Sequence, residues 1–117
     1  MSDIGTKYLF QCKTNYLDKI TPSNINRFEK AGYQKLVEIA EDYFQKGKLY
    51  DFVGFFQESQ YNVNLWTAHL IIEYGNPDEL IKKQAIAIII RYSTTPLDKD
   101  LANEEKVWLI NFNPELS

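Results

Sequence analysis

The sequence has only one cysteine, Cys12, and only one histidine, His69. A single thiol cannot form an intrachain disulfide, and one thiol with one imidazole falls short of the ligands of a structural zinc site. A reactive thiol needs a nearby base or positive field, and His69 is the sole candidate base. We therefore expect Cys12 to be a small buried residue, no metal or cofactor to be bound, and the protein to be cytoplasmic, in a reducing compartment.

Long hydrophobic runs and catalytic signatures are also missing. The longest purely apolar run is 85–90, and the first seven residues contain no apolar segment of the kind found in signal peptides. The chain has no glycine-rich phosphate loop, no GxSxG elbow and no HExxH motif. These absences predict a protein that is not an enzyme, has no catalytic residues and does not enter a membrane.

Positive charge is too sparse to indicate a phosphate-binding surface. The formal net charge is −3, and residues 61–117 carry five basic and eight acidic side chains. The densest basic cluster is the pair Lys82 and Lys83, whereas nucleic-acid-binding surfaces gather many such side chains. Nucleic-acid binding is therefore disfavoured, and a nucleic-acid- or nucleotide-interacting helical module is kept as the alternative function.

What the chain does contain is enough apolar material for a core. Of its 117 residues, 44% are hydrophobic, and the 17 aromatic residues are 7 Phe, 8 Tyr and 2 Trp. Length and composition predict a single domain over residues 1–117, with its core in about 24–112 and a tail at 113–117.

Two strongly apolar segments between Asn62 and Tyr92 are joined by turn residues. Gly75 suits the left-handed residue after a helix, Asn76 can cap the next helix, and Pro77 fits its first position. The pattern predicts a helix pair over about 63–74 and 78–92. The β-branched run 85–90 is also compatible with a buried strand, but the capped start and the length favour a helix.

Apolar residues at spacings of three and four predict further helices over about 33–45 and 49–58. The first of these has a possible earlier start near Thr21. Asp98 can cap a last helix reaching about Ile110, in which Glu104 and Glu105 would interact favourably with the helix dipole.

The N-terminal segment is predicted to form a short helix, from a stripe of residues at near-helical spacing: Leu9, Cys12, Tyr16 and Ile20. The sequence thus predicts an all-α protein of about five to six helices. Trp66 and Ile89, in the central pair, are expected in its core.

Two pairs of polar residues lie one helical turn apart. His69 precedes Glu73 by one turn, but a catalytic or metal-bound histidine needs further partners, so we interpret His69 as a structural polar residue. Glu38 and Asp42 could serve a cation or acid–base chemistry, although such charges usually form the solvated face of an amphipathic helix.

Several aromatic residues sit beside the apolar stripes, where they can remain exposed. Tyrosine is enriched among the residues that dominate binding energy at protein interfaces. We select Tyr50 and Tyr61, with Glu38 and Asp42, as candidate partner-binding residues.

The chain resembles HEAT-like helical-repeat proteins, and more narrowly a bacterial family of small, functionally uncharacterised HEAT-like domains. The resemblance covers about residues 24–112. It departs from the repeat pattern at Asn64, where HEAT-type inner helices often carry an arginine. The segments that carry it are Asn26-Arg27-Phe28, Gly47-Lys48-Leu49, the stretch 62–68, and 102–109.

The resemblance implies a stack of antiparallel helix pairs, an α-α superhelix, used to bind another protein. It brings no catalytic residues. Several small acidic bacterial domains of this type look like immunity proteins that neutralise a toxin. The hypothesis is therefore a non-enzymatic protein-binding module, with a cognate toxin as its most concrete partner.

Overall fold

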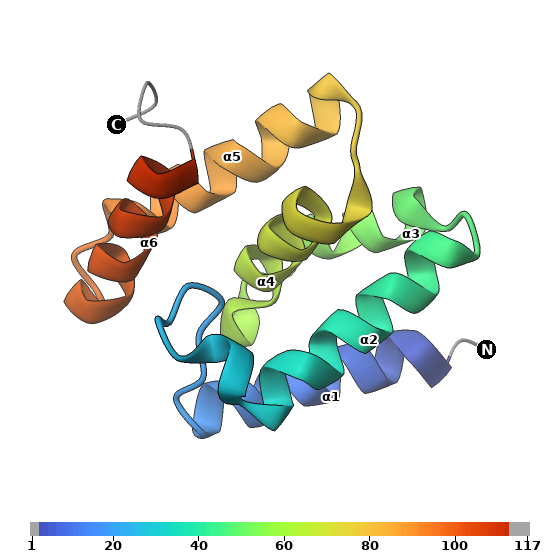
Figure 1. The fold of residues 1–117 in the computed structure, drawn as a ribbon, viewed down its shortest axis with the longest axis horizontal. Helices are drawn as coiled ribbons and strands as arrows, with labels where there is room; N and C mark the ends of the chain where they lie inside the picture. Colours follow the sequence, from blue (N-terminus) through green and yellow to red (C-terminus); the bar gives the residue numbers. More distant parts are fainter. Residues whose placement is uncertain (1–2, 113–117) are drawn as a thin grey trace.

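The alternation of apolar stripes and turn residues produces six α-helices in the computed structural model, which describes residues 3–112 (Figure 1). Their bounds are α1 Asp3–Leu17, α2 Ala31–Gln45, α3 Leu49–Val53, α4 Val63–Leu70, α5 Glu79–Ser93 and α6 Lys99–Phe112. No strand occurs in this range, and 85–90 lies within α5. The all-α prediction is confirmed, and the predicted tail at 113–117 lies outside the described residues.

Helix α4 occupies the centre of the fold, with α1 and α2 on one side and α5 and α6 on the other (Figure 1). All eight of its residues are buried, and Trp66 on α4 and Ile89 on α5 belong to the core as predicted. The radius of gyration, 13.3 Å, is that of a compact globule of this length. Within the described residues, no helix has both the length and the apolar character needed to cross a membrane.

Short helical turns complete the connections. Three are 3-10 turns, η1 Arg27–Glu29, η2 Gly54–Gln57 and η3 Gln60–Asn62, and the fourth, η4 Ile71–Gly75, is a π-helical turn that continues α4.

The helix 31–45 does not start near Thr21 as the alternative start predicted. Residues 18–30 form an irregular segment, in which the Asn24 side-chain oxygen accepts a hydrogen bond from the Asn26 backbone N–H at 2.9 Å. Such local side-chain bonds compete with helix formation. Lys30 is extended, and α2 begins at Ala31.

Helix α1 is a full helix, and its buried stripe differs from the predicted one. Tyr8, Cys12 and Asn15 face the core, whereas Leu9 and Tyr16 are exposed. Cys12 is buried as expected, and Ile20, which lies beyond the end of α1, packs partly buried against the core. Leu9 and Tyr16 are exposed because apolar residues lie on two faces of this helix.

The connection between α4 and α5 uses different residues from those predicted. Asn76, not Gly75, adopts the left-handed conformation, with φ 49°. Asp78, not Asn76, caps α5 by accepting a hydrogen bond from the Ile81 N–H at 2.9 Å. Gly75 packs closely against Phe44, since a Cβ there would lie 3.1 Å from the Phe44 ring and the ring would have to shift slightly.

Gly32 allows a buried amide to cross between α1 and α2. Asn15, which is fully buried, donates from Nδ2 to the Gly32 carbonyl oxygen at 3.1 Å, and its Oδ1 accepts from Gln11 Nε2 at 2.8 Å. A Cβ on residue 32 would collide with the Asn15 amide. The first turn of α2 therefore requires glycine for close approach.

We predict that Gly32→Ala lowers the free energy of unfolding by about 1–3 kcal/mol, because a buried amide must move to admit the methyl group. Gly54→Ala is the matched control. Gly54 has helical dihedral angles and open space around its Cα, so alanine should leave stability unchanged or raise it by about 0.4–1 kcal/mol. Urea denaturation of both variants measures the difference, and equal stabilities would contradict the packing role of Gly32.

Candidate functional site

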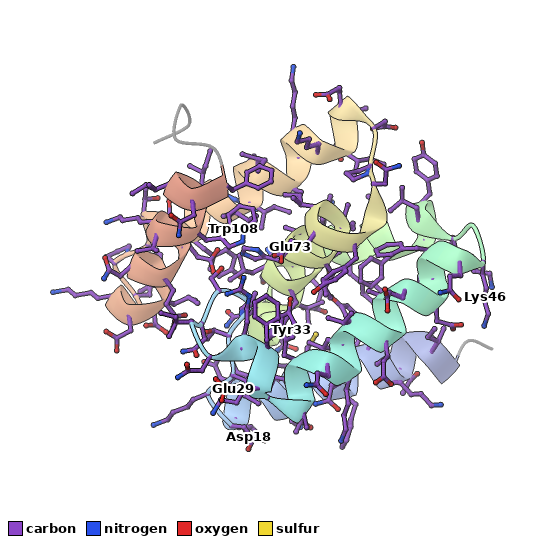
Figure 2. All side chains as sticks on the ribbon, viewed as in Figure 1. Asp18, Glu29, Tyr33, Lys46, Glu73 and Trp108 are labelled. Carbon is purple, nitrogen blue, oxygen red and sulfur yellow. The ribbon has the colours of Figure 1, made fainter. Side chains whose placement is uncertain are left out.

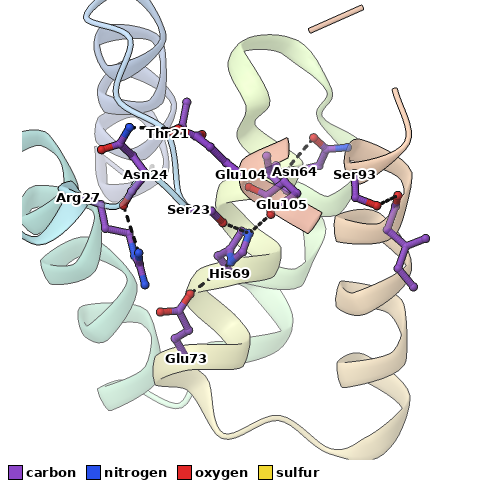
Figure 3. Close-up of polar contacts among 12 residues, drawn as sticks. Thr21, Ser23, Asn24, Arg27, Asn64, His69, Glu73, Ser93, Glu104 and Glu105 are labelled. Carbon is purple, nitrogen blue, oxygen red and sulfur yellow. Dashed lines mark hydrogen bonds and ion pairs between the residues drawn. The ribbon is translucent and has the colours of Figure 1, made fainter. Parts of the chain in front are cut away.

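His69 is the centre of a buried polar cluster that joins three elements (Figure 3). Its Nε2 lies 2.6 Å from Glu105 Oε1 on α6, and its Nδ1 lies 3.2 Å from Glu73 Oε2 one turn later. Ser23 Oγ, from the segment before α2, lies 3.1 Å from the same Nε2. His69 and Glu105 are 2% and 0% exposed, so the ion pair between them is shielded from water.

The two carboxylates keep His69 protonated. Burial opposes the charged imidazole, but the Glu105 carboxylate and then Glu73 outweigh it and raise the pKa of His69 from 6.5 to about 9. In this state both ring nitrogens donate hydrogen bonds, Nε2–H to Glu105 and Nδ1–H to Glu73. The edge-to-face ring of Trp108, 4.5 Å away, covers the imidazole.

Ser23, His69 and Glu73 follow the order of a hydrolase triad, with a hydroxyl at one ring nitrogen and a carboxylate at the other. A triad histidine must accept the hydroxyl proton at its unprotonated nitrogen. Here the Glu105 carboxylate, 2.6 Å from that nitrogen, favours the protonated imidazole, and this disfavours His69 as a general base for Ser23. The arrangement is suited to holding elements together rather than to activating a nucleophile.

The other candidates for chemistry are equally constrained. Burial raises the pKa of the Cys12 thiol from 9.0 to about 12, which disfavours the reactive thiolate. Among residues 3–112, no group of three or more His, Cys, Asp or Glu side chains is placed to hold a metal ion.

Glu104, next to Glu105, ties the segment 18–30 to α6. Its two oxygens accept hydrogen bonds from Thr21 Oγ1 at 2.6 Å and from Asn24 Nδ2 at 3.0 Å. Neither glutamate acts as the helix-dipole partner that the sequence suggested. Glu105 instead faces the interior, and one of its oxygens, Oε2, is buried with no hydrogen-bond partner among residues 3–112.

A pocket of about 370 Å³ lies beside the cluster, with Glu73 and Trp108 among its lining residues (Figure 2). Ile25, Val107 and Phe112 form an apolar rim.

The second candidate site is an apolar surface on α1 and η3, hereafter the α1 surface. It consists of the side chains of Leu9, Phe10, Lys13, Tyr16, Leu17 and Tyr61. Phe10 and Leu17 are 69% and 66% exposed, and a groove of about 310 Å³ runs between α1 and η3. Exposed apolar side chains gathered on one face are typical of interaction sites.

Tyr61 lines the side of this groove opposite α1, and Asn62 follows it in the chain. Both adopt left-handed backbone conformations, with φ of 52° and 59°. Two such residues in succession are strained when neither is glycine, and strain of this kind is concentrated at functional sites. The Tyr61 ring packs edge-on against Tyr16 at 5.5 Å and lies under the Lys13 ammonium group, 5.7 Å away.

The four predicted partner-binding residues do not gather at one place. Glu38 and Asp42 line a shallow pocket of about 330 Å³ on α2, where Asp42 pairs with Lys46 at 3.0 Å, at the edge of the molecule (Figure 2). Tyr50 is exposed on α3 and donates to Asp78 Oδ2 at 3.2 Å. Tyr61 alone lies on the α1 surface.

Sequence reasoning missed Glu105, Ser23 and the outer residues of α1. Contacts of His69 with Ser23 and Glu105 span 46 and 36 residues of sequence, and no local pattern signals them. The α1 surface did leave a signal, because apolar residues at Leu9, Phe10, Tyr16 and Leu17 exceed what one buried stripe can accommodate.

Comparison of the chain with models of known protein families, with curated proteins and with solved structures found no match.

The raised pKa of His69 makes stability depend on pH. The folded-state pKa lies above the unfolded value, so the ion pair contributes its full stabilisation, about 3 kcal/mol, below pH 6.5 and loses it as pH rises through about 9. The buried Cys12 thiol adds a loss only near and above its unfolded pKa of 9.0. We therefore predict that the free energy of unfolding falls by about 2 kcal/mol between about pH 6.5 and 8.5.

Urea denaturation across this range, on the wild type and two variants, tests the assignment. Glu105→Gln removes the carboxylate that contributes most to the raised pKa, so this variant should be less stable and its stability should vary less with pH. Glu104→Gln removes the neighbouring carboxylate, for which no contact with His69 is seen, and should keep the wild-type slope. An unchanged slope in Glu105→Gln would show that another group is responsible.

Proposed function

We propose that this protein is a non-enzymatic binding module that recognises another protein through the α1 surface. The observation that carries the proposal is the outer face of α1, where four large apolar side chains remain exposed in a fold whose interior is otherwise well filled. Binding interfaces draw on such clustered apolar and aromatic residues, with charged residues at their edges.

The positions of these residues support a continuous binding surface rather than unrelated exposed apolar side chains. Leu9, Phe10, Tyr16 and Leu17 fall at helical positions i, i+1, i+7 and i+8, so they form one stripe over two turns. The opposite face of α1 carries Tyr8, which is fully buried against α4. One face thus serves folding, and the other is free for a partner.

A HEAT-like stack of helix pairs belongs to the same proposal. Successive helices joined by short connections pack on one another, α4 on α5 and α5 on α6, and α1 packs on α2. Asn64, which replaces the arginine common in HEAT-type helices, supplies a different polar link. Its Oδ1 accepts a hydrogen bond from the Tyr92 hydroxyl on α5 at 2.7 Å.

Site-specific photocrosslinking in the native cells tests the binding proposal. Benzoylphenylalanine at position 10 should crosslink a single protein, and the additional change Leu17→Ala should abolish the crosslink by removing apolar contact. The same amino acid at position 97, where Leu97 is 93% exposed on the loop before α6, is the matched control and should give no such product. Equal crosslinking from both positions would contradict the proposal, and a product destroyed by nuclease would favour the nucleic-acid alternative.

The particular form that we propose is neutralisation of a toxin, which follows from the resemblance to small acidic immunity proteins and from the net charge of −3. The crosslinked partner, expressed alone, should then arrest growth, and co-expression of this protein should restore it. The double variant Phe10→Ala and Leu17→Ala should fail to protect while retaining its fold by circular dichroism. Harmless expression of the partner would contradict the immunity role but leave protein binding intact.

A further inference from the structure

Charge on the α1 surface restricts what can bind there. Between Ile4 and Leu17 the helix carries two lysines, Lys7 and Lys13, and no acidic residue, although the protein as a whole is acidic. Lys13 stands in the middle of the apolar stripe, one turn after Leu9 and one turn before Leu17. Within residues 3–112, no carboxylate lies within ion-pairing distance of Lys13.

The groove beside Lys13 has an apolar floor and two distinct walls. Phe10 and Val63 contribute apolar surface, and Tyr61 closes the far side. Glu58, the single acidic residue lining the groove, already uses its Oε2 to accept a hydrogen bond from the Gln60 N–H at 3.0 Å. Among the described residues that line the groove, Lys13 is the basic one, and its ammonium group supplies the positive charge that an acidic ligand group would meet.

We propose that this groove binds an amphipathic α-helix of another protein, which places an acidic side chain against Lys13. The proposal rests on the proposed binding function and specifies its partner. The stripe from Leu9 to Leu17 is about 12 Å long, which matches two turns of a partner helix with apolar residues at i, i+3, i+4 and i+7. A carboxylate beside that apolar face, at one of the positions between these residues, would meet Lys13.

A second copy of this chain fits the surface poorly. Pairing α1 with its copy about a two-fold axis through the stripe, parallel or antiparallel, places Lys13 opposite Lys13. Like charges opposed across an interface oppose association.

An anionic membrane fits poorly as well. Glu58 stands at the rim of the groove and would face the lipid phosphates, and a concave groove beside α1 leaves an apolar cavity that a flat surface does not fill. A folded helix with a projecting side chain fills it.

A displayed library of amphipathic helices of about 18 residues tests the inference. Leucine or phenylalanine is fixed at i, i+3, i+4 and i+7, and the positions between them vary among Glu, Gln and Lys. Selection on the wild-type protein should enrich Glu over Lys at one central position by roughly three- to tenfold. The variant Lys13→Glu should invert this preference, selecting Lys.

Lys83→Glu on α5 is the matched control, since it makes the same charge change at an exposed lysine away from α1. It should keep the preference for Glu. A preference that survives Lys13→Glu, or no enrichment of any helix, would overturn the inference. Two further results would also overturn it: dimerisation of the free protein that Phe10→Ala disrupts, and tighter binding to phosphatidylserine vesicles than to the selected helices.

The two proposals fail in different ways. If photocrosslinking from position 10 identifies a protein while the library shows no acidic preference, the binding function stands and the helical acidic partner is wrong. If the library behaves as expected but no protein crosslinks in cells, the groove has the inferred chemistry and the proposed function fails.

Discussion

Complete burial of α4 is the constraint on which the rest of the structure depends. Its eight residues include three polar ones, Asn64, Thr67 and His69, and a buried polar group without a partner costs about 1–3 kcal/mol. Each is paired with a different helix. Asn64 accepts from Tyr92 on α5, Thr67 exchanges a 2.8 Å hydrogen bond with Tyr8 on α1, and His69 pairs with Glu105 on α6. Hydrophobic burial brings the helices together, and these three bonds fix which helix lies against which side of α4.

The His69 cluster illustrates the cost of such a design. Removing one member of a buried ion pair leaves an uncompensated charge, which destabilises a protein by about 3–5 kcal/mol. Replacing a whole pair with apolar residues is often neutral or favourable, so the cluster is better explained by specificity than by stability. It positions α6 and, through Ser23, the irregular segment 18–30. Glu104 contacts the same segment directly, through hydrogen bonds from Thr21 and Asn24. The segment is thus attached to α6 both by Glu104 and, through the contact of Ser23 with His69, by Glu105.

Features that depend on interactions between residues close in sequence could be predicted, whereas features that depend on contacts between distant residues could not. Helices α2, α5 and α6 were predictable because their apolar spacing and the cap at Asp98 are local; the Leu101 N–H donates to Asp98 Oδ1 at 3.1 Å. The N-cap of α5 was predicted two residues too early, because Asn76 and Asp78 both have side chains that can cap a helix. Asn76 adopts a left-handed backbone conformation, and Asp78 is the residue that caps α5. Glu105 was missed, although the spacing of Leu101, Trp108 and Leu109 places it on the same buried face of α6. Its partner His69 is 36 residues away in sequence, and local spacing does not identify that contact.

Helix α1 was the least predictable helix, because its sequence supports two faces at once. Its inner face is fixed by Tyr8, bonded to Thr67, and by Asn15, bonded to the Gly32 carbonyl. The Tyr8 ring also packs against Phe52 and Phe55 at 4.9 and 4.8 Å. These contacts hold the helix backbone in place, so the outer side chains Phe10 and Leu17 are presented on a rigid support. Because a preorganised surface loses less conformational entropy on association, the bonds that stabilise the inner face also lower the cost of binding at the outer one. The buried polar contacts of α4 therefore act on the proposed binding surface without touching it.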